Sequence, residues 1–320
     1  MIILTGGAGF IGSCVLRALN DAGRADVLVV DSLRSGTKWK NLVGKKFVDL
    51  LSKEQFRQVI TSDAFEFDVD AVIHLGACSS TTESDADYLY DNNYLYSIDV
   101  AEFAIGKNAR FVYASSAATY GDGTLGYDDT TVDLRPLNMY GFSKHLFDNW
   151  IRESDLTDSC VGLKLFNVFG PNEDHKGDMR SMVAKAFDQI QSTGGVQLFA
   201  SNDAAFADGG QMRDFIYVKD VVNVIMTLLG RTDVNGIYNL GTGKARTWND
   251  LVKAVSKSMK KRPKITYIDM PDQVKGQYQN FTQADMSRFS SVLPDVAFTS
   301  LEDAVSDYVE QHLMQNRATY

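Results

Sequence analysis

The sequence is poor in the residues that hold small secreted proteins together or bind metals. It has only three cysteines, Cys14, Cys78 and Cys160, which form no C-x-x-C pair, and four widely separated histidines without an H-E-x-x-H pattern. A sparse, odd number of cysteines is typical of reduced thiols in the cytosol and argues against a disulfide framework or a zinc site. We therefore expect a cytoplasmic protein without a bound metal.

Long apolar runs and an excess of positive charge are also missing. No run approaches the roughly 18 apolar residues of a membrane span. The opening segment MIILTGG is apolar over only four residues and lacks a basic stretch, so no signal peptide is expected. The net charge is −9, with lysine and arginine scattered among the acids. This balance argues against nucleic acid and anionic membranes as main partners.

The chain is long enough for one large domain or two closely joined ones. Its 320 residues, of which 44% are hydrophobic and 23% charged, can bury a full core. The first half alternates short β-branched runs with helical stretches, which predicts an α/β fold, a Rossmann-type doubly wound parallel sheet with helices on both faces. The expected strands are 1–6, 26–31, 45–50, 70–77, 109–116 and 161–170, and the expected helices are 10–22, 53–62, 84–106 and 138–155.

Beyond residue 170 the alternation becomes irregular. Residues 200–212 read as a polar loop, and 213–222 as a strand that returns to the sheet and continues into a helix. Further strands are expected at 236–243 and 264–269. We predict a larger NADP-binding Rossmann domain and a smaller mixed α/β substrate-binding domain. The former comprises residues 1–166 plus about 213–240, and the latter about 167–212 plus 241–320.

The segment TGGAGFIG, residues 5–12, follows the first expected strand and opens the first helix. It contains G-x-G-x-x-G as Gly7, Gly9 and Gly12. Glycines at these positions allow a tight turn and close approach of the backbone to a pyrophosphate, while the helix N-terminus offers N–H groups and positive potential. Asp31, at the end of the second expected strand, suits the adenosine ribose of a dinucleotide. The complete pattern predicts a bound dinucleotide.

Several cations follow the second expected strand. Arg34, Lys38 and Lys40 come directly after it, and Lys53 begins the next helix. Such a group can bind the 2′-phosphate of NADP, so NADP is expected, with NAD as the alternative. The segment LGACSSTTE, residues 75–83, follows the fourth strand and consists mostly of small residues. Its backbone can therefore lie near the nicotinamide side of the cofactor.

Catalytic residue types follow the fifth expected strand. YASSAATYG places Ser115 and Ser116 at the carboxyl end of a parallel strand, where such sheets bind ligands. NMYGFSK then puts Tyr140 and Lys144 on one face of a helix. Alone, that pair is more typical of an exposed helix surface. Beside a dinucleotide, the serine can hold a substrate oxygen and the tyrosine can exchange its proton. The lysine can bind the cofactor ribose and favour the tyrosinate.

These motifs resemble the extended short-chain dehydrogenase/reductase family, in which Ser-Tyr-Lys drives hydride transfer to a nicotinamide. Segments such as GACSSTTE, DNNYLYS, FNVFGPNEDHKG and KGQYQNFTQAD extend the resemblance over essentially the whole chain, toward the nucleotide-sugar epimerases that act on ADP-heptose. The resemblance implies oxidation at C6 of the heptose to a ketone, rotation of the ketone in the site and reduction from its other face. It also implies a role in lipopolysaccharide core synthesis and a homo-oligomer, a pentamer in the family.

The resemblance further implies which residues form the site. One tyrosine cannot serve both faces of the substrate, and the family's second base is a lysine in an HKG segment. The expected catalytic residues are Ser116, Tyr140, Lys144 and Lys176. The expected cofactor contacts are Gly6, Gly9, Phe10, Ile11, Gly12, Asp31, Ser32, Lys38, Lys53, Leu75, Gly76, Ala77, Cys78, Ser79, Asn92, Lys144, Val168 and Lys176, with Asn93 as an alternative helix residue to Asn92. The expected substrate contacts are Ser116, Asn167, Asp178, Lys185, Phe199, Ala200, Ser201, Asn202, Arg213 and Tyr278.

Three positions depart from the family pattern. Asp178 replaces a serine, Lys185 a histidine and Leu75 a glutamate. The first two changes leave open a related ADP-sugar or another sugar-nucleotide epimerase. A 4,6-dehydratase would need Thr-Asp-Glu near the fifth strand, where this chain has SSAATY. The intact Ser-Tyr-Lys set argues against a cofactor-binding protein without turnover.

Overall fold

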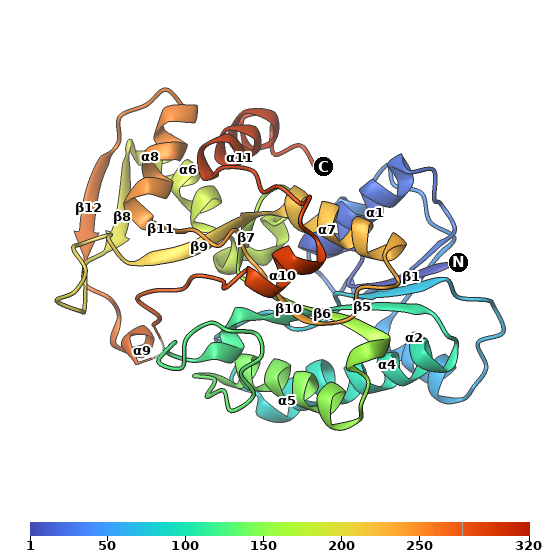
Figure 1. Cartoon of the computed structure of the whole chain (residues 1–320). Helices are drawn as coiled ribbons and strands as arrows, with labels where there is room; N and C mark the ends of the chain where they lie inside the picture. Colours follow the sequence, from blue (N-terminus) through green and yellow to red (C-terminus); the bar gives the residue numbers. More distant parts are fainter. Residues whose placement is uncertain (277) are drawn as a thin grey trace.

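A seven-stranded sheet forms the centre of the protein in the computed structural model, which describes residues 1–276 and 278–320 (Figure 1). The strand order is β10-β6-β5-β4-β1-β2-β3, and the neighbouring strands pair in parallel. This arrangement confirms the predicted doubly wound α/β fold. The strands are β1 (Ile2–Thr5), β2 (Val27–Val30), β3 (Asp49–Leu51), β4 (Ala71–His74), β5 (Arg110–Ser116), β6 (Cys160–Leu165) and β10 (Gly236–Leu240).

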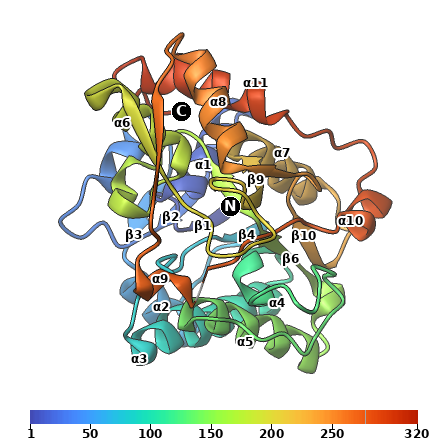
Figure 2. The same cartoon turned by 90° about the vertical axis from the view of Figure 1, so that its left-hand side faces the viewer.

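Helices cover both faces of this sheet, as Figure 2 shows. The sequence of β1 explains the two layers, because Ile2 and Leu4 join the hydrophobic cluster on one face and Ile3 joins the cluster on the other. Strands buried on both faces are continuous apolar runs, as observed here. One face carries α1 (Phe10–Asp21) and α7 (Val218–Gly230), and the other α2 (Lys53–Thr61), α4 (Tyr96–Gly106) and α5 (Met139–Glu153).

Two predictions about strands were wrong. Residues 161–170, expected as one strand, divide at Phe166 into β6 and β7 (Asn167–Phe169). The N–H of Phe166 donates to the carbonyl of Leu240 at the end of β10 (3.1 Å), and beyond it the chain leaves the main sheet. Residues 213–217, expected to return to that sheet, belong to β9 (Met212–Tyr217). β9 pairs with β7 and with β11 (Ala245–Thr247) in a separate three-stranded sheet. Apolar periodicity predicts a strand but not its partner, which explains both errors.

A smaller region lies beside the main sheet, at the upper left of Figure 1. There β8 (Gly195–Phe199) pairs in parallel with β12 (Lys264–Ile268), so the strand predicted at 264–269 is confirmed. The division into two domains remains a prediction. The other helices are α3 (Ala86–Leu89), α6 (Met182–Thr193), α8 (Trp248–Ser258), α9 (Asp272–Lys275), α10 (Ser287–Val292) and α11 (Leu301–Tyr308).

Several short helical turns connect these elements. They are η1 (Lys38–Leu42), η2 (Tyr90–Leu95), η3 (Ala117–Tyr120), η4 (Thr157–Ser159), η5 (Asp174–Met179) and η6 (Val309–Leu313).

Within the described residues, no helix is long and apolar enough to cross a membrane.

Candidate active site

The glycine loop lies between the end of β1 and the start of α1, and only glycine fits its tightest positions. Gly6 has a φ of +69°, and a Cβ there would lie 2.7 Å from the backbone nitrogen of Gly76. A Cβ on Gly12 would lie 2.1 Å from the carbonyl oxygen of Gly6. The N-cap of α1 is Gly9, which offers no side chain, so the first N–H groups of the helix can bind a phosphate. The loop therefore fits the diphosphate of a dinucleotide.

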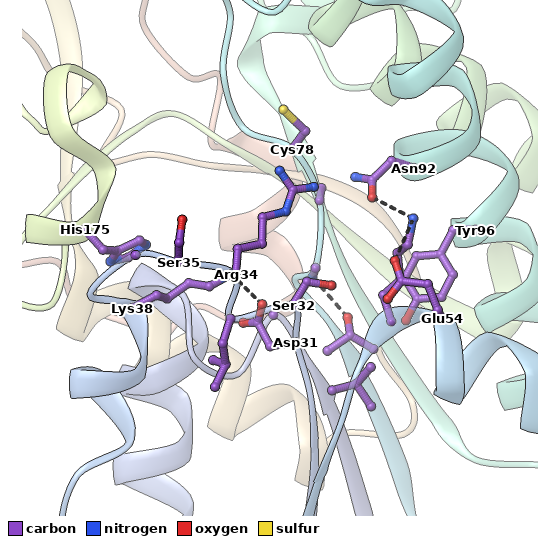
Figure 3. A pocket seen from close by; sticks show the side chains of 18 of the residues that line it. Asp31, Ser32, Arg34, Ser35, Lys38, Glu54, Cys78, Asn92, Tyr96 and His175 are labelled. Carbon is purple, nitrogen blue, oxygen red and sulfur yellow. Dashed lines mark hydrogen bonds and ion pairs between the residues drawn. The ribbon is translucent and has the colours of Figure 1, made fainter.

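A cavity of about 420 Å³ lies beside this loop (Figure 3). Its walls come from the ends of β1, β2 and β4 and from the helices that follow β3 and β4. It thus occupies the carboxyl ends of parallel strands, where open α/β sheets bind their ligands. Nine of the expected cofactor residues line it: Gly6, Asp31, Ser32, Lys38, Lys53, Gly76, Ala77, Cys78 and Asn92.

The other expected cofactor residues lie outside this lining. Gly9, Phe10, Ile11 and Gly12 form the beginning of α1, and Leu75 and Ser79 flank the loop after β4. Val168, Lys144 and Lys176 lie on β7, α5 and η5. The cavity corresponds in its residues to the adenosine end of the expected dinucleotide, and the roles of these residues remain predictions.

Cations gather around the carboxylate of Asp31. Lys38 Nζ lies 2.5 Å from Asp31 Oδ1, and the N–H of Ala8 donates to Asp31 Oδ2 at 2.9 Å. Lys53 Nζ donates to Asn92 Oδ1 at 3.2 Å across the cavity. Arg34 enters from the loop after β2, and in the described part of the chain no carboxylate forms an ion pair with it. An anion in this cavity would therefore meet several positive groups.

Ser116 and Tyr140 come together where β5 ends and α5 begins. Asn138 caps α5, with its Oδ1 accepting from the N–H of Gly141 at 2.8 Å. A Cβ on Gly141 would lie 2.6 Å from the carbonyl oxygen of Ala118, so this glycine lets the helix start closely approach the turn after β5. Burial raises the pKa of Tyr140, and a hydrogen bond from the side chain of Ser116 opposes that rise. The predicted serine and tyrosine are thus neighbours.

Lys144 is buried one helical turn beyond Tyr140, with an exposed fraction of 5%. Its Nζ donates to the carbonyl oxygen of Ala114 on β5 at 2.9 Å. Burial lowers the pKa of Lys144 to about 8, although the charge of Asp148 opposes the shift. The expected role of Lys144 in favouring the tyrosinate stays a prediction.

A buried asparagine links the loop after β4 to α5. Asn93 Oδ1 accepts from the N–H of Cys78 at 2.8 Å, and its Nδ2 donates to Cys78 O at 3.0 Å. The same Nδ2 donates to Ser143 Oγ at 3.1 Å, which in turn donates to the carbonyl oxygen of Tyr140. Asn93 lies in the π-helical turn η2, a form often found at functional sites. The two asparagines of DNNYLYS therefore differ, since Asn92 faces the cavity and Asn93 ties its wall to the catalytic helix.

Lys176 lies on the turn η5, where Gly177 has a φ of +54°. Its Nζ sits 5.4 Å from the ring centre of Phe10, at the start of α1. Burial lowers the pKa of Lys176. Within the described residues, no hydrogen bond or ion pair joins Lys176 to Ser116 or Tyr140. The structure therefore places this lysine beside the glycine loop, and its role as a second acid/base group remains a prediction.

Arg213 forms the centre of an aromatic cluster in the smaller region. Its guanidinium lies 4.9 Å from the ring centre of Tyr278 and 5.6 Å from that of Trp248. Trp248 Nε1 donates to the hydroxyl of Tyr278 at 2.9 Å, and the ring of Phe199 lies 6.2 Å from that of Tyr278. Three expected substrate residues thus meet, while Asn167 and Asp178 are exposed and Lys185 is half-buried on α6.

The sequence interpretation missed three features: Trp248, the hydrogen bonds that join Asn93 to Cys78 and Ser143, and the buried pair of Asp148 and Lys164. Trp248 carries no local signal, because it reaches Arg213 only through the pairing of β11 with β9.

Ala200, Ser201 and Asn202, which were expected beside an adenine, follow β8. There the N–H of Ser201 donates to Asp208 at 2.8 Å. Their role in binding remains a prediction.

Comparisons with known proteins agree with these features. The chain matches the model of the NAD dependent epimerase/dehydratase family over residues 2–241. It is 53% identical over 316 residues to an ADP-L-glycero-D-manno-heptose-6-epimerase of Nitratidesulfovibrio vulgaris (strain DP4), covering 98% of each chain. The crystal structure of ADP-L-glycero-D-manno-heptose-6-epimerase from Helicobacter pylori superposes with a TM-score of 0.82 at 28% identity, covering 97% of this chain and 95% of that one. A Thermus thermophilus UDP-glucose 4-epimerase in complex with NAD gives 0.75 at 25% identity, covering 97% of each.

Proposed function

The chain belongs to the NAD dependent epimerase/dehydratase family, and from this premise we propose that it interconverts ADP-D-glycero-D-manno-heptose and ADP-L-glycero-D-manno-heptose at C6. The observation that carries the proposal is that Ser116 neighbours Tyr140, with Lys144 one helical turn on and bonded to the same strand, in a chain whose glycine loop fits a dinucleotide. Identity of 53% over nearly the full length to a relative named for this activity supports the choice of sugar.

On the first face of the substrate, the chain's own groups bind and move a proton. The Ser116 hydroxyl holds the oxygen on C6, and Tyr140, as the tyrosinate, takes the hydroxyl proton and later returns it. Lys144 holds Ala114 of β5 and would also donate to the cofactor ribose. The nicotinamide group, when bound, supplies the acceptor and donor of hydride. The reaction consumes no cofactor, because the hydrogen removed from C6 is returned to C6.

The second face of the ketone needs an acid/base group on the opposite side, and we assign it to Lys176. The lowered pKa of this half-buried lysine brings it nearer to the pH at which an amine exchanges protons efficiently. Its ammonium lies beside the ring of Phe10 at the start of α1, on a different element from Tyr140. We propose that these two groups, on different elements, serve the two faces that an epimerase must reach.

The proposed cofactor is NADP, with NAD as the alternative. Lys38, Lys53 and Arg34 line the cavity at the end of β2, where a 2′-phosphate would lie. Asp31, which would otherwise repel that phosphate, is already held by Lys38 and the N–H of Ala8. Charge-assisted hydrogen bonds to phosphate are among the stronger polar contacts.

Arg213 is the proposed anchor for the diphosphate of the substrate. Burial lowers its pKa, and among the described residues no carboxylate pairs with it. A buried cation without a counter-ion is costly, and a diphosphate between Arg213 and Tyr278 would supply the missing charge. Arginine also suits bidentate recognition of phosphate. We further propose a cytoplasmic homo-oligomer with the two domains predicted from the sequence.

The proposal is tested by incubating the protein and its cofactor with ADP-D-glycero-D-manno-heptose and separating the C6 epimers. We expect interconversion, and we expect UDP-glucose to remain unchanged in a parallel reaction. Turnover of UDP-glucose without turnover of the heptose would favour the alternative, another sugar-nucleotide epimerase. Retained dinucleotide binding without any turnover would refute the assignment to ADP-heptose.

A further inference from the structure

A carboxylate lies directly beneath the catalytic lysine and has no part in the chemistry described above. Asp148 follows Lys144 by one helical turn on the same face of α5. It is completely buried and accepts three hydrogen bonds. Ser115 Oγ donates to Asp148 Oδ2 at 2.7 Å and Tyr113 Oη to Oδ1 at 3.1 Å, both from β5. The third donor is a lysine of the neighbouring strand.

That lysine is Lys164 of β6, whose exposed fraction is also 0%. Its Nζ lies 2.6 Å from Asp148 Oδ2 and donates to Thr119 Oγ1 at 2.9 Å. Thr119 Oγ1 in turn donates to the carbonyl oxygen of Ser116 at 2.8 Å. Lys164 thus contacts α5 through Asp148 and, through Thr119, the turn η3 that follows Ser116.

Three consecutive residues of β5 face α5. Ala114 accepts from Lys144, Ser115 donates to Asp148, and the Ser116 side chain lies close enough to Tyr140 to oppose the rise in its pKa. We propose that the buried Lys164–Asp148 pair is a positioning device that fixes Ser116 relative to the Tyr140–Lys144 face of α5. The inference rests on the proposed catalytic role of those three residues.

Stability alone does not account for such a pair. Two apolar residues of similar volume often join buried elements at least as well, because both charges must be removed from water. Unlike apolar contacts, the hydrogen bonds of the ion pair are directional, so each of them fixes the position of one neighbouring side chain. The neighbours in question are Ser115 and Thr119, which adjoin or contact Ser116.

The pair also acts on Lys144 through its charge. The Asp148 carboxylate supports the charged form of Lys144 and so limits the fall that burial causes in the pKa of this lysine. Asp148 is one turn from Lys144, whereas Lys164 reaches the site through Asp148 and Thr119. Removing both charges should therefore lower the pKa of Lys144 further, which a merely structural contact would not do.

The test uses the full chain with Lys164→Met and Asp148→Asn combined, which removes both charges together and leaves neither unpaired. A matched control is Lys219→Met with Asp307→Asn, because that pair has the same residue types and the same 2.6 Å separation but joins α7 to α11. The steady-state constants are measured with ADP-D-glycero-D-manno-heptose. The pKa of Lys144 is measured without substrate, from the pH dependence of its acetylation by trace acetic anhydride, read by peptide mass spectrometry.

We expect the Lys164/Asp148 double variant to lose at least tenfold in kcat with KM changed less than threefold, and to lower the pKa of Lys144 by at least half a unit. The control should keep both values. Lys164→Arg, which retains the cation, should recover kcat to within about fivefold of wild type. A folded double variant with wild-type kcat and an unshifted Lys144 would overturn the proposal.

If the double variant does not fold, Asp148→Asn alone decides, because the amide keeps the size of the side chain and one of the two acceptor oxygens that Tyr113 and Ser115 use. The same shift and the same loss of kcat are expected, and wild-type values of both would overturn the proposal. The acetylation needs no substrate. A shifted Lys144 in a protein whose wild type ignores ADP-heptose would therefore refute the proposed substrate and leave the positioning role standing.

Discussion

Lys144 Nζ donates a hydrogen bond to the carbonyl oxygen of Ala114, 2.9 Å away and two residues before Ser116 on β5. This contact joins the catalytic helix to the strand that carries the serine. It also explains why Lys144 is buried rather than part of a solvated helix surface. The Tyr-x-x-x-Lys spacing thus points both side chains toward β5, where Lys144 bonds to Ala114.

Tyr140→Phe removes the proposed proton carrier and keeps the ring. Since a positioned acid/base group contributes about 10²–10⁴-fold to a rate, kcat for epimerisation should fall by that order. Dinucleotide binding, measured by fluorescence titration, should stay within threefold. Tyr90→Phe, at an exposed tyrosine, should keep full activity. Substantial activity in the Tyr140 variant would show that another group carries the proton.

Dinucleotide binding should weaken as the pH rises through about 8. The pKa of Lys144 is lowered to about 8, so its ammonium is lost well below the usual range of a lysine. Only the charged form has all three donors for Ala114 and the cofactor ribose. Affinity measured from pH 6.5 to 9.5 should show a decline with a midpoint near 8, and Lys144→Met should abolish that midpoint. A midpoint above 10 would contradict the buried state of Lys144.

Lys38→Met should weaken NADP more than NAD. The change removes a cation near the expected 2′-phosphate and leaves the carboxylate of Asp31 without its lysine partner. A hydrogen bond to a charged group contributes about 1.5–3 kcal/mol, so the ratio of the two dissociation constants should change by about tenfold or more. Lys40→Met, at an exposed lysine outside the cavity lining, is the control. An equal effect on both cofactors would favour NAD as the natural one.

Arg213→Met should impair binding of the ADP-sugar while leaving the cofactor site intact. The substitution keeps an aliphatic side chain between Trp248 and Tyr278 but removes the only cation found there among the described residues. We expect KM for the substrate to rise at least tenfold. Arg246→Met is a close control, because Arg246 lies opposite Arg213 in the β9–β11 pairing and binds Glu302 instead. Equal effects of the two substitutions would indicate that Arg213 serves folding only.

The sequence predicted features formed by residues close together in the chain better than features formed by residues far apart in it. The glycine loop and the Tyr140–Lys144 spacing are local patterns, and the structure gives both the expected setting. The partner of β9 depends on tertiary pairing, so the prediction that it returns to the main sheet was wrong. The contact of Trp248 with Tyr278 is equally long-range.

The buried pair of Lys164 and Asp148 could be predicted only in part, because each residue has a local signal but their contact does not. Asp148 was accessible to helical reasoning, because it continues the series Tyr140, Lys144 at four-residue intervals. Lys164 stood out as a charge within the apolar run VGLKLF. Neither signal showed that the two meet, since that contact requires β6 to pair with β5 and α5 to cover both strands.

The most direct test of the central claim follows the hydrogen at C6. ADP-D-glycero-D-manno-heptose carrying deuterium at C6 is incubated with the enzyme and its cofactor in ordinary water, and the product is analysed by mass spectrometry and NMR. Transient oxidation and reduction within one site predicts the L-glycero epimer with deuterium retained at C6 and no net change in cofactor. Product that has exchanged its deuterium for solvent hydrogen, or no epimer at all, would contradict the account.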